Sequence, residues 1–455
     1  MSSSPSLTTD LRRGFHGGWV ASYVVAGLLL VGLYSASPNF SLGPGTDQGL
    51  LAGDYLQEWV GGYIVRSDQR SRLYDQAFAD RCEHDPSLVG FSWDPGEYLP
   101  MVYPPFWYLA VSPLSALPYH VAAGAWAALM TATIVVSCLV LRWWIRCEAK
   151  SAAMAVCVAL LPASIVFPPV IENLTSGQKG GLCLLLFTVT YCLLDKKRSF
   201  AAGCVFGLLL FKPQFTLVLF PCMVLRRDLR FAAGFCVTAI ALSGIALAMG
   251  WSLCEEYGRF LSHASDYLAS AGYALEKSHS LYGAIALAGG GIGSAVRMTA
   301  AIAVLAVLIC MGWTAWKWPA AAWWFTSKTH RRMVSQRRSG VRPLAVDLAA
   351  ITLATLLVSP HLYSYDLTIL LLPCASLLRE DVRDWLGAQF RLTGWIAACL
   401  LAICGVSPII AAKSGVQLTT VLMVALWWCF AFARTSLHFR VETAPGDRWT
   451  SPVDA

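Results

Sequence analysis

A short acidic and aromatic cluster follows the first hydrophobic segment and is the strongest candidate for chemistry in this chain. Residues 53–59 read Gly-Asp-Tyr-Leu-Gln-Glu-Trp and carry the carboxylates of Asp54 and Glu58. Charged groups beside a bilayer are costly, so they indicate a functional site. The structural alternative for Asp54 is that it caps or anchors a helix. Glu58 lies one helical turn later on the same face, where a supporting or solvated role is favoured.

Further polar residues coincide with prolines that interrupt apolar segments, such as Pro104-Pro105, Pro168-Pro169, Lys212-Pro213 and Ser359-Pro360. Irregular backbone at membrane depth is tolerated only where it is buried in protein or lines a cavity. We therefore expect one large cavity open to the exterior. Its expected lining comes from the first loop, the interruptions and a late exterior turn: Asp47, Asp54, Glu58, Tyr103, Asn173, Gln178, Lys179, Lys212, His361, Tyr363, Tyr365 and Asp366.

Several of these side chains also have a structural interpretation. Lys212 can extend its charged end to the interface from an apolar segment, although the adjacent proline supports phosphate binding at least as well. His361 is either a polar group at a helix start or a site residue. An acid favours the N-terminal dipole of a helix, so the structural interpretation leads for Asp366.

The sequence lacks the signatures of several other chemistries. It has no DxD or HExxH motif, its eight histidines are not at metal-ligand spacing, and no phosphate-binding loop follows a strand. A nucleotide-sugar site with a metal is therefore unsupported, and we expect no cofactor and no metal. Most of the 15 cysteines lie in apolar segments, whereas Cys82 and Cys254 fall in two exterior loops, which leaves a disulfide between them open.

Membrane-spanning helices must position the candidate residues. Hydrophobic residues make up 56% of the 455 residues and charged residues only 13%, against about 25% charged in soluble domains. A span needs about 20 apolar residues. We predict an all-α polytopic membrane protein with about 11–13 transmembrane helices and surface helices in the first exterior loop. Within that loop, aromatic residues at helical spacing around Tyr55 and Trp59 predict an amphipathic helix on the membrane surface.

The predicted organisation is one transmembrane domain, residues 18–435, between a cytoplasmic N-terminus and a cytoplasmic tail. The predicted spans are 18–36, 121–141, 151–167, 179–194, 200–225, 231–249, 294–316, 344–358, 365–378, 394–412 and 417–433. The flanking segments are 1–17 and 436–455, the exterior loops are 37–100 and 251–293, and a basic cytoplasmic loop covers 317–343.

Basic residues cluster in short loops at 142–150, 196–198, 226–230 and 317–342. This bias orients membrane helices and is favoured over a nucleic-acid surface, so no nucleic-acid partner is expected. If residues 103–141 cross the membrane twice, two of the clusters face outside. If they cross once in effect, every cluster faces inside and Lys212 lies near the outer side, which is the arrangement we favour.

A series of short motifs occurs in a particular order. They are Asp54-Tyr55 with Leu73-Tyr74-Asp75, then Tyr103-Pro104-Pro105 with Ser112-Pro113-Leu114 and Leu117-Pro118, then Ser176-Gly177-Gln178 and Ala202-Gly203 with Lys212-Pro213-Gln214 and Arg226-Arg227, then Ser280-Leu281-Tyr282-Gly283 and Ser359-Pro360-His361. In this order they resemble, over about residues 47–373, the polyprenol-phosphate-mannose-dependent α-mannosyltransferases, glycosyltransferase family 87 of the GT-C superfamily.

The resemblance implies a GT-C fold, a lipid-linked sugar donor and transfer on the exterior face. By position Asp54 matches the family's catalytic base, and Lys212 and His361 fall in motifs that line the site. The chain departs from the family at Lys179-Gly180, where a small polar residue and Asn are usual. It departs again at residues 278–280, where Ser-His-Ser replaces Asn-Gln-Ser.

These observations predict an integral-membrane glycosyltransferase. It would move a hexose, mannose by resemblance, from a polyprenyl-phosphate donor to a hydroxyl of a lipid or glycan acceptor, with inversion. Asp54 would be the general base, and a phosphate leaving group, already a stable anion, would require no metal. The residues expected to bind the donor phosphate or substrate are Lys212, His361, Gln178, Glu58, Tyr103, His279 and Tyr365.

The expected partners are the polyprenyl-phosphate sugar, a glycolipid or glycan acceptor and membrane lipids. The expected location is a bacterial-type cytoplasmic (inner) membrane, with the site facing the periplasm. A transporter or lipid flippase is the alternative, because broken helices and buried polar residues occur there too. Transporters usually show inverted repeats and small exterior loops, whereas the polar residues here gather beside a long exterior loop.

Overall fold

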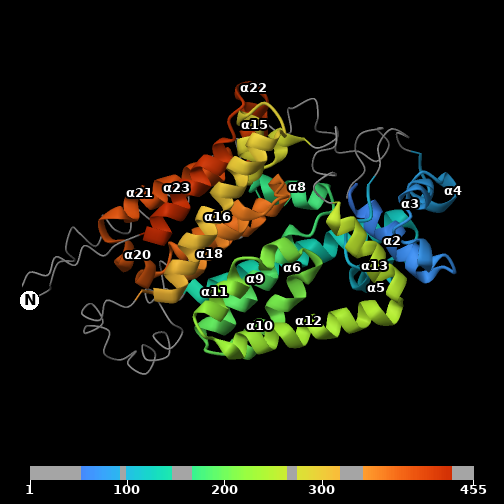
Figure 1. Cartoon of the computed structure of the whole chain (residues 1–455), viewed down its shortest axis with the longest axis horizontal. Coiled ribbons are helices and arrows are strands. Elements are labelled where there is room, and N and C mark those ends of the chain that lie inside the picture. The colour runs from blue at the N-terminus through green and yellow to red at the C-terminus, as the bar shows by residue number, and fades with distance from the viewer. Residues whose placement is uncertain (1–52, 93–98, 146–165, 264–273, 318–341, 433–455) are drawn as a thin grey trace, which may run out of the picture.

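The long apolar helices show how the chain crosses a membrane. The computed structural model describes residues 53–92, 99–145, 166–263, 274–317 and 342–432 (Figure 1), and within these ranges it contains helices and no strands. Four helices there are long and apolar enough to span: α6 (Tyr119–Ile145), α12 (Leu229–Met249), α16 (Ser294–Lys317) and the run from α20 (Glu380–Leu386) through η9 (Gly387–Gln389) to α21 (Phe390–Ile403). The chain is therefore a multi-pass membrane protein.

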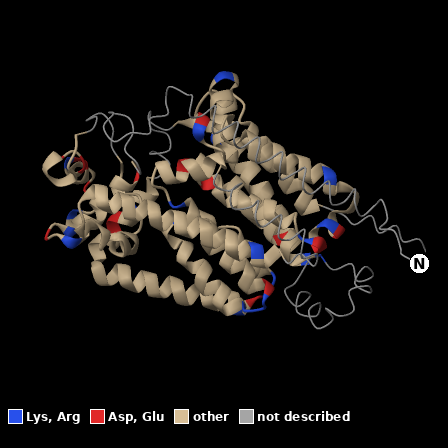
Figure 2. Ribbon diagram, turned by 180° about the vertical axis from the view of Figure 1, so that it is seen from behind, with Lys and Arg blue, Asp and Glu red and all other residues tan. Residues whose placement is uncertain are grey.

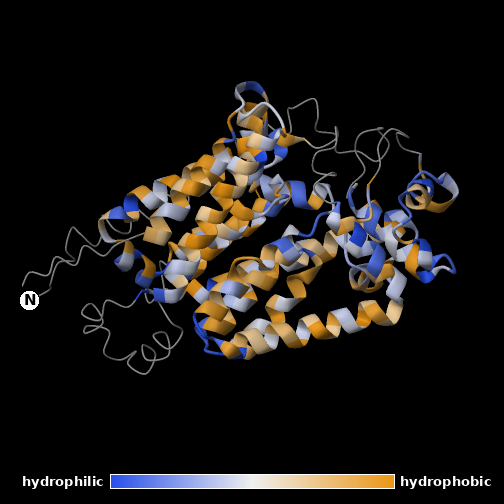
Figure 3. Cartoon of the chain, in the orientation of Figure 1, coloured by the Kyte–Doolittle hydropathy of each residue, from blue (hydrophilic) through white to orange (hydrophobic). Residues whose placement is uncertain are grey.

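A fifth candidate span is bent. The chain bends by 113° between helices α22 (Ser407–Ser414) and α23 (Leu418–Phe432). The break between α21 and α22 divides the single helix predicted at 394–412. Along the long helices the ribbon is mainly hydrophobic, as Figure 3 shows. Charged residues are concentrated at helix ends and connecting segments (Figure 2), as expected for helices surrounded by lipid.

Shorter apolar helices complete the bundle. They are α9 (Gly180–Asp195), α10 with η3 (Ser199–Phe211), η4 with α11 (Pro213–Leu225), and α18 (Leu344–Val358). The predicted span 200–225 is thus interrupted at Lys212-Pro213, as the proline predicts. The predicted span 365–378 consists of η8 (Ser364–Leu370) followed by α19 (Leu371–Ser376).

Several predicted segments lie outside the described residues: the first span 18–36, nearly all of the span 151–167, most of the basic loop 317–343, and the flanking segments 1–17 and 436–455. The count of about 11–13 transmembrane helices therefore stays a prediction, as do the domain boundaries.

The described part of segment 37–100, predicted to be an exterior loop, folds into α2 (Tyr55–Arg66), η1 (Arg70–Arg72), α3 (Gln76–Glu83) and α4 (Pro86–Val89). Helix α2 packs against α5 (Pro105–Val111), η2 (Leu114–Ala116) and α6, and is buried along nearly its whole length. The prediction that this helix lies on the membrane surface is wrong, because its aromatic residues face protein on several sides. The short α3 and α4 do expose residues, so the loop retains surface helices.

Helix α18 connects the two ends of the bundle. All of its residues are buried, and it packs against α16, α19 and α23. Its first turn carries Asp347, and its C-terminal end leads into Ser359-Pro360-His361. At 1.5 Å per residue, Asp347 and Ser359 are roughly 18 Å apart along the helix axis.

A buried charge cluster marks the first of these ends. Arg226 and Arg342 both pair with Asp347, at 2.9 Å and 2.5 Å. Arg342 also donates hydrogen bonds to the carbonyl oxygens of Phe430 and Ala431, at 2.7 Å and 2.8 Å. Because the last carbonyls of a helix have no intrahelical partner, Arg342 caps α23 and joins it to α18.

Candidate functional site

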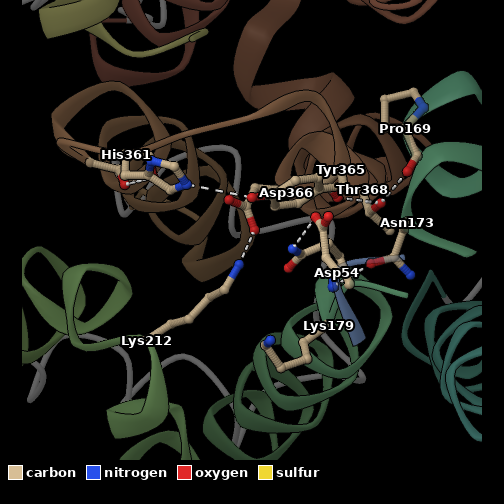
Figure 4. Close-up of polar contacts among 12 residues, drawn as sticks. Asp54, Pro169, Asn173, Lys179, Lys212, His361, Tyr365, Asp366 and Thr368 are labelled. Carbon is tan, nitrogen blue, oxygen red and sulfur yellow. Dashed lines mark hydrogen bonds and ion pairs between the residues drawn. The ribbon is translucent and has the colours of Figure 1, made fainter. Parts of the chain in front are cut away.

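The carboxylate of Asp54 connects two distant parts of the chain. Its backbone N–H donates to the carbonyl oxygen of Ser176 at 3.0 Å, and its Oδ2 accepts a hydrogen bond from Gln178 Nε2 at 2.7 Å (Figure 4). Asp54 stands at the N-cap of α2 but makes no side-chain cap bond. By contrast, Asp75 caps α3 by accepting from the N–H of Phe78. The capping interpretation of Asp54 is therefore wrong, because its side chain points instead to Gln178.

The turn that holds Asp54 consists of residues 176–178 and follows α8 (Pro168–Thr175). Gly177 forms it by adopting φ 69°, a left-handed conformation that glycine reaches without steric cost. The carbonyl oxygen of Gly177 accepts a hydrogen bond from Trp126 Nε1 at 2.7 Å. The N–H of Gln178 donates to the carbonyl oxygen of Asn173 at 2.9 Å. These bonds fix the amide of Gln178 against Asp54.

A buried ion pair lies beside this contact. Glu58 and Lys179 pair with each other, and their side chains are 1% and 0% exposed. The Lys179 ammonium lies 3.8 Å from the centroid of the Tyr103 ring, a cation–π contact. The solvated role considered for Glu58 is therefore wrong. Glu58 lies one helical turn after Asp54, and Lys179 directly follows Gln178. Two adjacent contacts, Asp54–Gln178 and Glu58–Lys179, therefore join the start of α2 to the turn.

A second ion pair forms at the predicted helix break. Lys212 Nζ lies 2.6 Å from Asp366 Oδ1, and both side chains are buried. The ammonium is also 5.1 Å from the Tyr365 ring centroid, and His361 Nε2 lies 3.4 Å from the Tyr365 hydroxyl oxygen. Asp366 is therefore the counter-ion of Lys212 in addition to standing in the first turn of η8. A phosphate that reaches Lys212 would share it with this carboxylate.

His279 is an internal support. Its side chain is fully buried, and its ring Nε2 lies 3.0 Å from Ser364 Oγ. Its backbone N–H donates to the carbonyl oxygen of Leu362 at 2.8 Å. Its carbonyl oxygen accepts a hydrogen bond from Thr420 in α23 at 2.7 Å. His279 thus joins segment 251–293, predicted to be an exterior loop, to the start of η8 and to α23.

The predicted site residues come from distant segments but lie together. Figure 4 shows Asp54, Lys179, Lys212, His361, Tyr365 and Asp366 in one region, contributed by the N-cap of α2, the residue before α9, the break between η3 and η4, and the segment around η8. Tyr103 lies beneath Lys179, and its carbonyl oxygen accepts a hydrogen bond from the Tyr74 hydroxyl at 2.7 Å. Asp47 lies outside the described residues.

Sequence analysis missed Glu172. It lies in α8, one residue before Asn173, and desolvation by burial raises its pKa to about 7. An acid among apolar residues three positions after Pro168-Pro169 is the same signal that drew attention to Asn173, so the sequence contained the information.

Burial controls the proton affinities in the site. Desolvation raises the pKa of Asp54, while the hydrogen bond from Gln178 and then the charge of Lys179 act in the opposite direction. Desolvation also lowers the pKa of His361 to about 4 and that of His279 to about 3. Near neutral pH both imidazoles are therefore uncharged, and a carboxylate with a raised pKa is matched to accept a proton there.

Two further expectations concern metals and thiols. No group of three or more potential protein ligands that could hold a metal ion is found among the described residues. Cys82 is buried and Cys254 is half-buried, and both are free thiols in the structure.

An all-helical membrane fold with polar residues collected at helix interruptions defines the class, a multi-pass membrane protein with an internal polar site. The sequence model of glycosyltransferase family 87 matches residues 101–360, more than half of the chain. The chain belongs to glycosyltransferase family 87, whose members are membrane glycosyltransferases of the GT-C type, and this confirms the predicted family and fold class. Neither the curated proteins nor the solved structures include a significant match.

Proposed function

We propose that the protein transfers a hexose, with mannose as the first candidate, from a polyprenyl-phosphate donor to a hydroxyl group of a glycolipid or glycan acceptor. The observation that carries this proposal is the environment of Asp54. Its carboxylate is half-buried, is held by Gln178 rather than by its own helix, and has a pKa raised by desolvation. Such a group can accept a proton from a hydroxyl near neutral pH.

The proposed reaction is a single inverting displacement. The acceptor oxygen attacks the anomeric carbon while Asp54 takes its proton, and the bond from that carbon to the phosphate oxygen breaks. The leaving polyprenyl phosphate carries the negative charge. In this proposal Lys212, the neutral His361 and Tyr365 donate to this anion, and electrostatic stabilisation of this kind is usually the largest contribution to catalysis.

The buried charges support an orientation for the proposed site. Arg226 and Arg342 gather at the N-terminal end of α18, and His361 follows its C-terminal end. Basic residues favour the cytoplasmic side. The site would then face the exterior, the periplasm in a bacterial-type inner membrane.

The direct test is hexose transfer by purified protein in lipid nanodiscs, with a short-chain polyprenyl phosphate mannose as donor and octyl glycosides as acceptors. Replacing a general base lowers the rate by about 10²–10⁴-fold, so Asp54→Asn should lose that much activity. Asp68→Asn changes an exposed acid of the same loop and should leave the rate unchanged. Transfer by Asp54→Asn at the wild-type rate would overturn the assignment of the base.

A further inference from the structure

Two turns of the bundle place a basic residue where glycine is usual. Lys197 follows α9 and Arg227 follows α11, with φ of 62° and 61°. Among the described residues they are the only two other than glycine with positive φ. Helices α10 and α12, which begin directly after these turns, lie side by side (Figure 1). The two turns therefore belong to the same end of the bundle.

Both turns close a helix end in the same way. The N–H of Arg227 donates to the carbonyl oxygen of Val224 at 2.8 Å, and the N–H of Lys197 donates to that of Leu194 at 2.9 Å. Glycine fits such a helix end without strain, so a basic side chain there costs stability. The helix dipole favours a cation at this end, but the preceding residue of each turn is already basic. The second charge therefore indicates a further role.

The adjacent arginines of the second turn have different surroundings. Arg226 is 1% exposed and pairs with Asp347 inside the bundle. Arg227 is exposed, and its guanidinium carbon lies 5.5 Å from the centroid of the Trp316 ring. Asp228, the acid that follows, is buried and caps α12 by accepting from a backbone N–H. The charge that this turn presents at the surface is therefore positive.

A second cation lies at the end of the neighbouring helix. Lys317 is exposed, its Nζ lies 4.6 Å from the centroid of the Trp313 ring, and α16 packs against α11. Trp313 and Trp316 are 58% and 59% exposed. Tryptophan is enriched at the level of the lipid headgroups. The contacts with Trp313 and Trp316 therefore place both cations at headgroup level.

An apolar stripe leads along α16 to these cations. Exposed side chains follow one another at intervals of three or four residues on one face of the helix and end beside Lys317: Met298, Ile302, Leu305, Ile309 and Trp313. Acyl chains of the bilayer can lie along such a face. A molecule that matches both the stripe and the cations must combine an anionic head with apolar chains.

We propose that Arg227 and Lys317 bind the phosphate group of an anionic phospholipid whose acyl chains lie along α16. The lipid would hold α11 and α16 together. Its site lies at the end of the bundle where Arg226 meets the first turn of α18, whereas His361 of the candidate sugar-transfer site follows the other end of that helix. This lipid site is therefore separate from the proposed sugar transfer and does not depend on it.

The test measures lipid binding to purified protein in a neutral detergent by native mass spectrometry. The two probes are phosphatidylglycerol and phosphatidylcholine with the same acyl chains. A basic residue near an anionic lipid contributes about fivefold to affinity, so the first phosphatidylglycerol should bind about 25-fold more tightly than phosphatidylcholine. A ligand that binds only the folded state stabilises it, so phosphatidylglycerol should also raise the thermal midpoint.

Matched variants separate lipid binding from folding. Arg227→Gly removes the charge and suits the left-handed backbone, so its thermal midpoint without lipid should stay close to wild type. Combined with Lys317→Gln, it should weaken phosphatidylglycerol binding by about 25-fold and abolish the thermal shift, with phosphatidylcholine binding unchanged. Arg227→Lys retains the charge and should retain most of the affinity. Arg70→Gln changes an exposed basic residue of η1 and should behave as wild type.

Three results would overturn this inference. The first is equal affinity of the wild-type protein for the two lipids. The second is an unchanged affinity for phosphatidylglycerol in the double variant. The third is displacement of phosphatidylglycerol by millimolar inorganic phosphate, which would show a site for a free anion in place of a lipid.

Discussion

Replacing Gln178 by methionine would test the central contact of the site. Methionine has a similar length but cannot donate the 2.7 Å hydrogen bond to Asp54. That bond stabilises the ionised carboxylate and lowers its pKa, in opposition to desolvation. A hydrogen bond to a charged group is worth about 1.5–3 kcal/mol, and one pKa unit corresponds to about 1.4 kcal/mol. The pKa of Asp54 should therefore rise by about one to two units in Gln178→Met.

The assay is the pH dependence of kcat/KM for hexose transfer. A base works in its ionised form, so the rate falls as the pH drops through its pKa, and the acid limb of the profile reports that pKa in the free enzyme. In Gln178→Met this limb should move to higher pH by about one to two units. Activity should be about 10–100-fold below wild type on the acid limb and should approach the wild-type value at higher pH.

Recovery at higher pH distinguishes a shifted pKa from a damaged fold. A matched control is Gln69→Met, which changes an exposed glutamine of the first loop and should not move the profile. An unmoved acid limb in Gln178→Met, or an equal loss of activity at every pH, would refute the argument that Gln178 controls the protonation of Asp54.

Two further predictions concern buried features of the fold. Asp347→Asn leaves the guanidinium groups of Arg226 and Arg342 without their shared counter-ion, and should cost about 3–5 kcal/mol of stability, seen as a lower thermal midpoint in detergent. Removing all three charges together, with Arg226→Met, Arg342→Met and Asp347→Leu, should recover part of that loss, and a triple variant no more stable than Asp347→Asn would contradict the explanation. Gly180→Ala should displace η8, because a Cβ there overlaps the Tyr365 carbonyl oxygen, and we expect at least a roughly tenfold loss of transfer with a reduced thermal midpoint. A wild-type transfer rate together with a wild-type thermal midpoint would show that residue 180 and η8 can move apart at no cost in free energy.

Apolar composition predicted the long helices well because their surroundings are uniform. A lipid-facing helix needs only length and apolar composition, and α6, α12 and α16 begin and end within about four residues of the predicted limits. The break at Lys212-Pro213 was predictable for an equally local reason, the missing N–H of proline.

Pairings between distant residues were not predictable in this way. Sequence analysis identified Lys212 and Asp366 separately, but their ion pair joins residues 154 positions apart. Helix α2 was expected on a surface because an aromatic stripe looks the same whether its partner is lipid or protein. Glu172, by contrast, could have been predicted, because an acid among apolar residues is a signal within the sequence itself.

The Glu58–Lys179 pair has a consequence for how this enzyme can diverge. A charge buried without its partner is strongly destabilising, so the two positions can change only together or in an order that passes through a compensating neighbour. Lys179 lies inside the segment that defines the family, whereas Glu58 and the candidate base Asp54 lie before it begins at residue 101. Relatives that have a lysine at the position of Lys179 should therefore also have an acidic residue at the position of Glu58, which the family model does not cover.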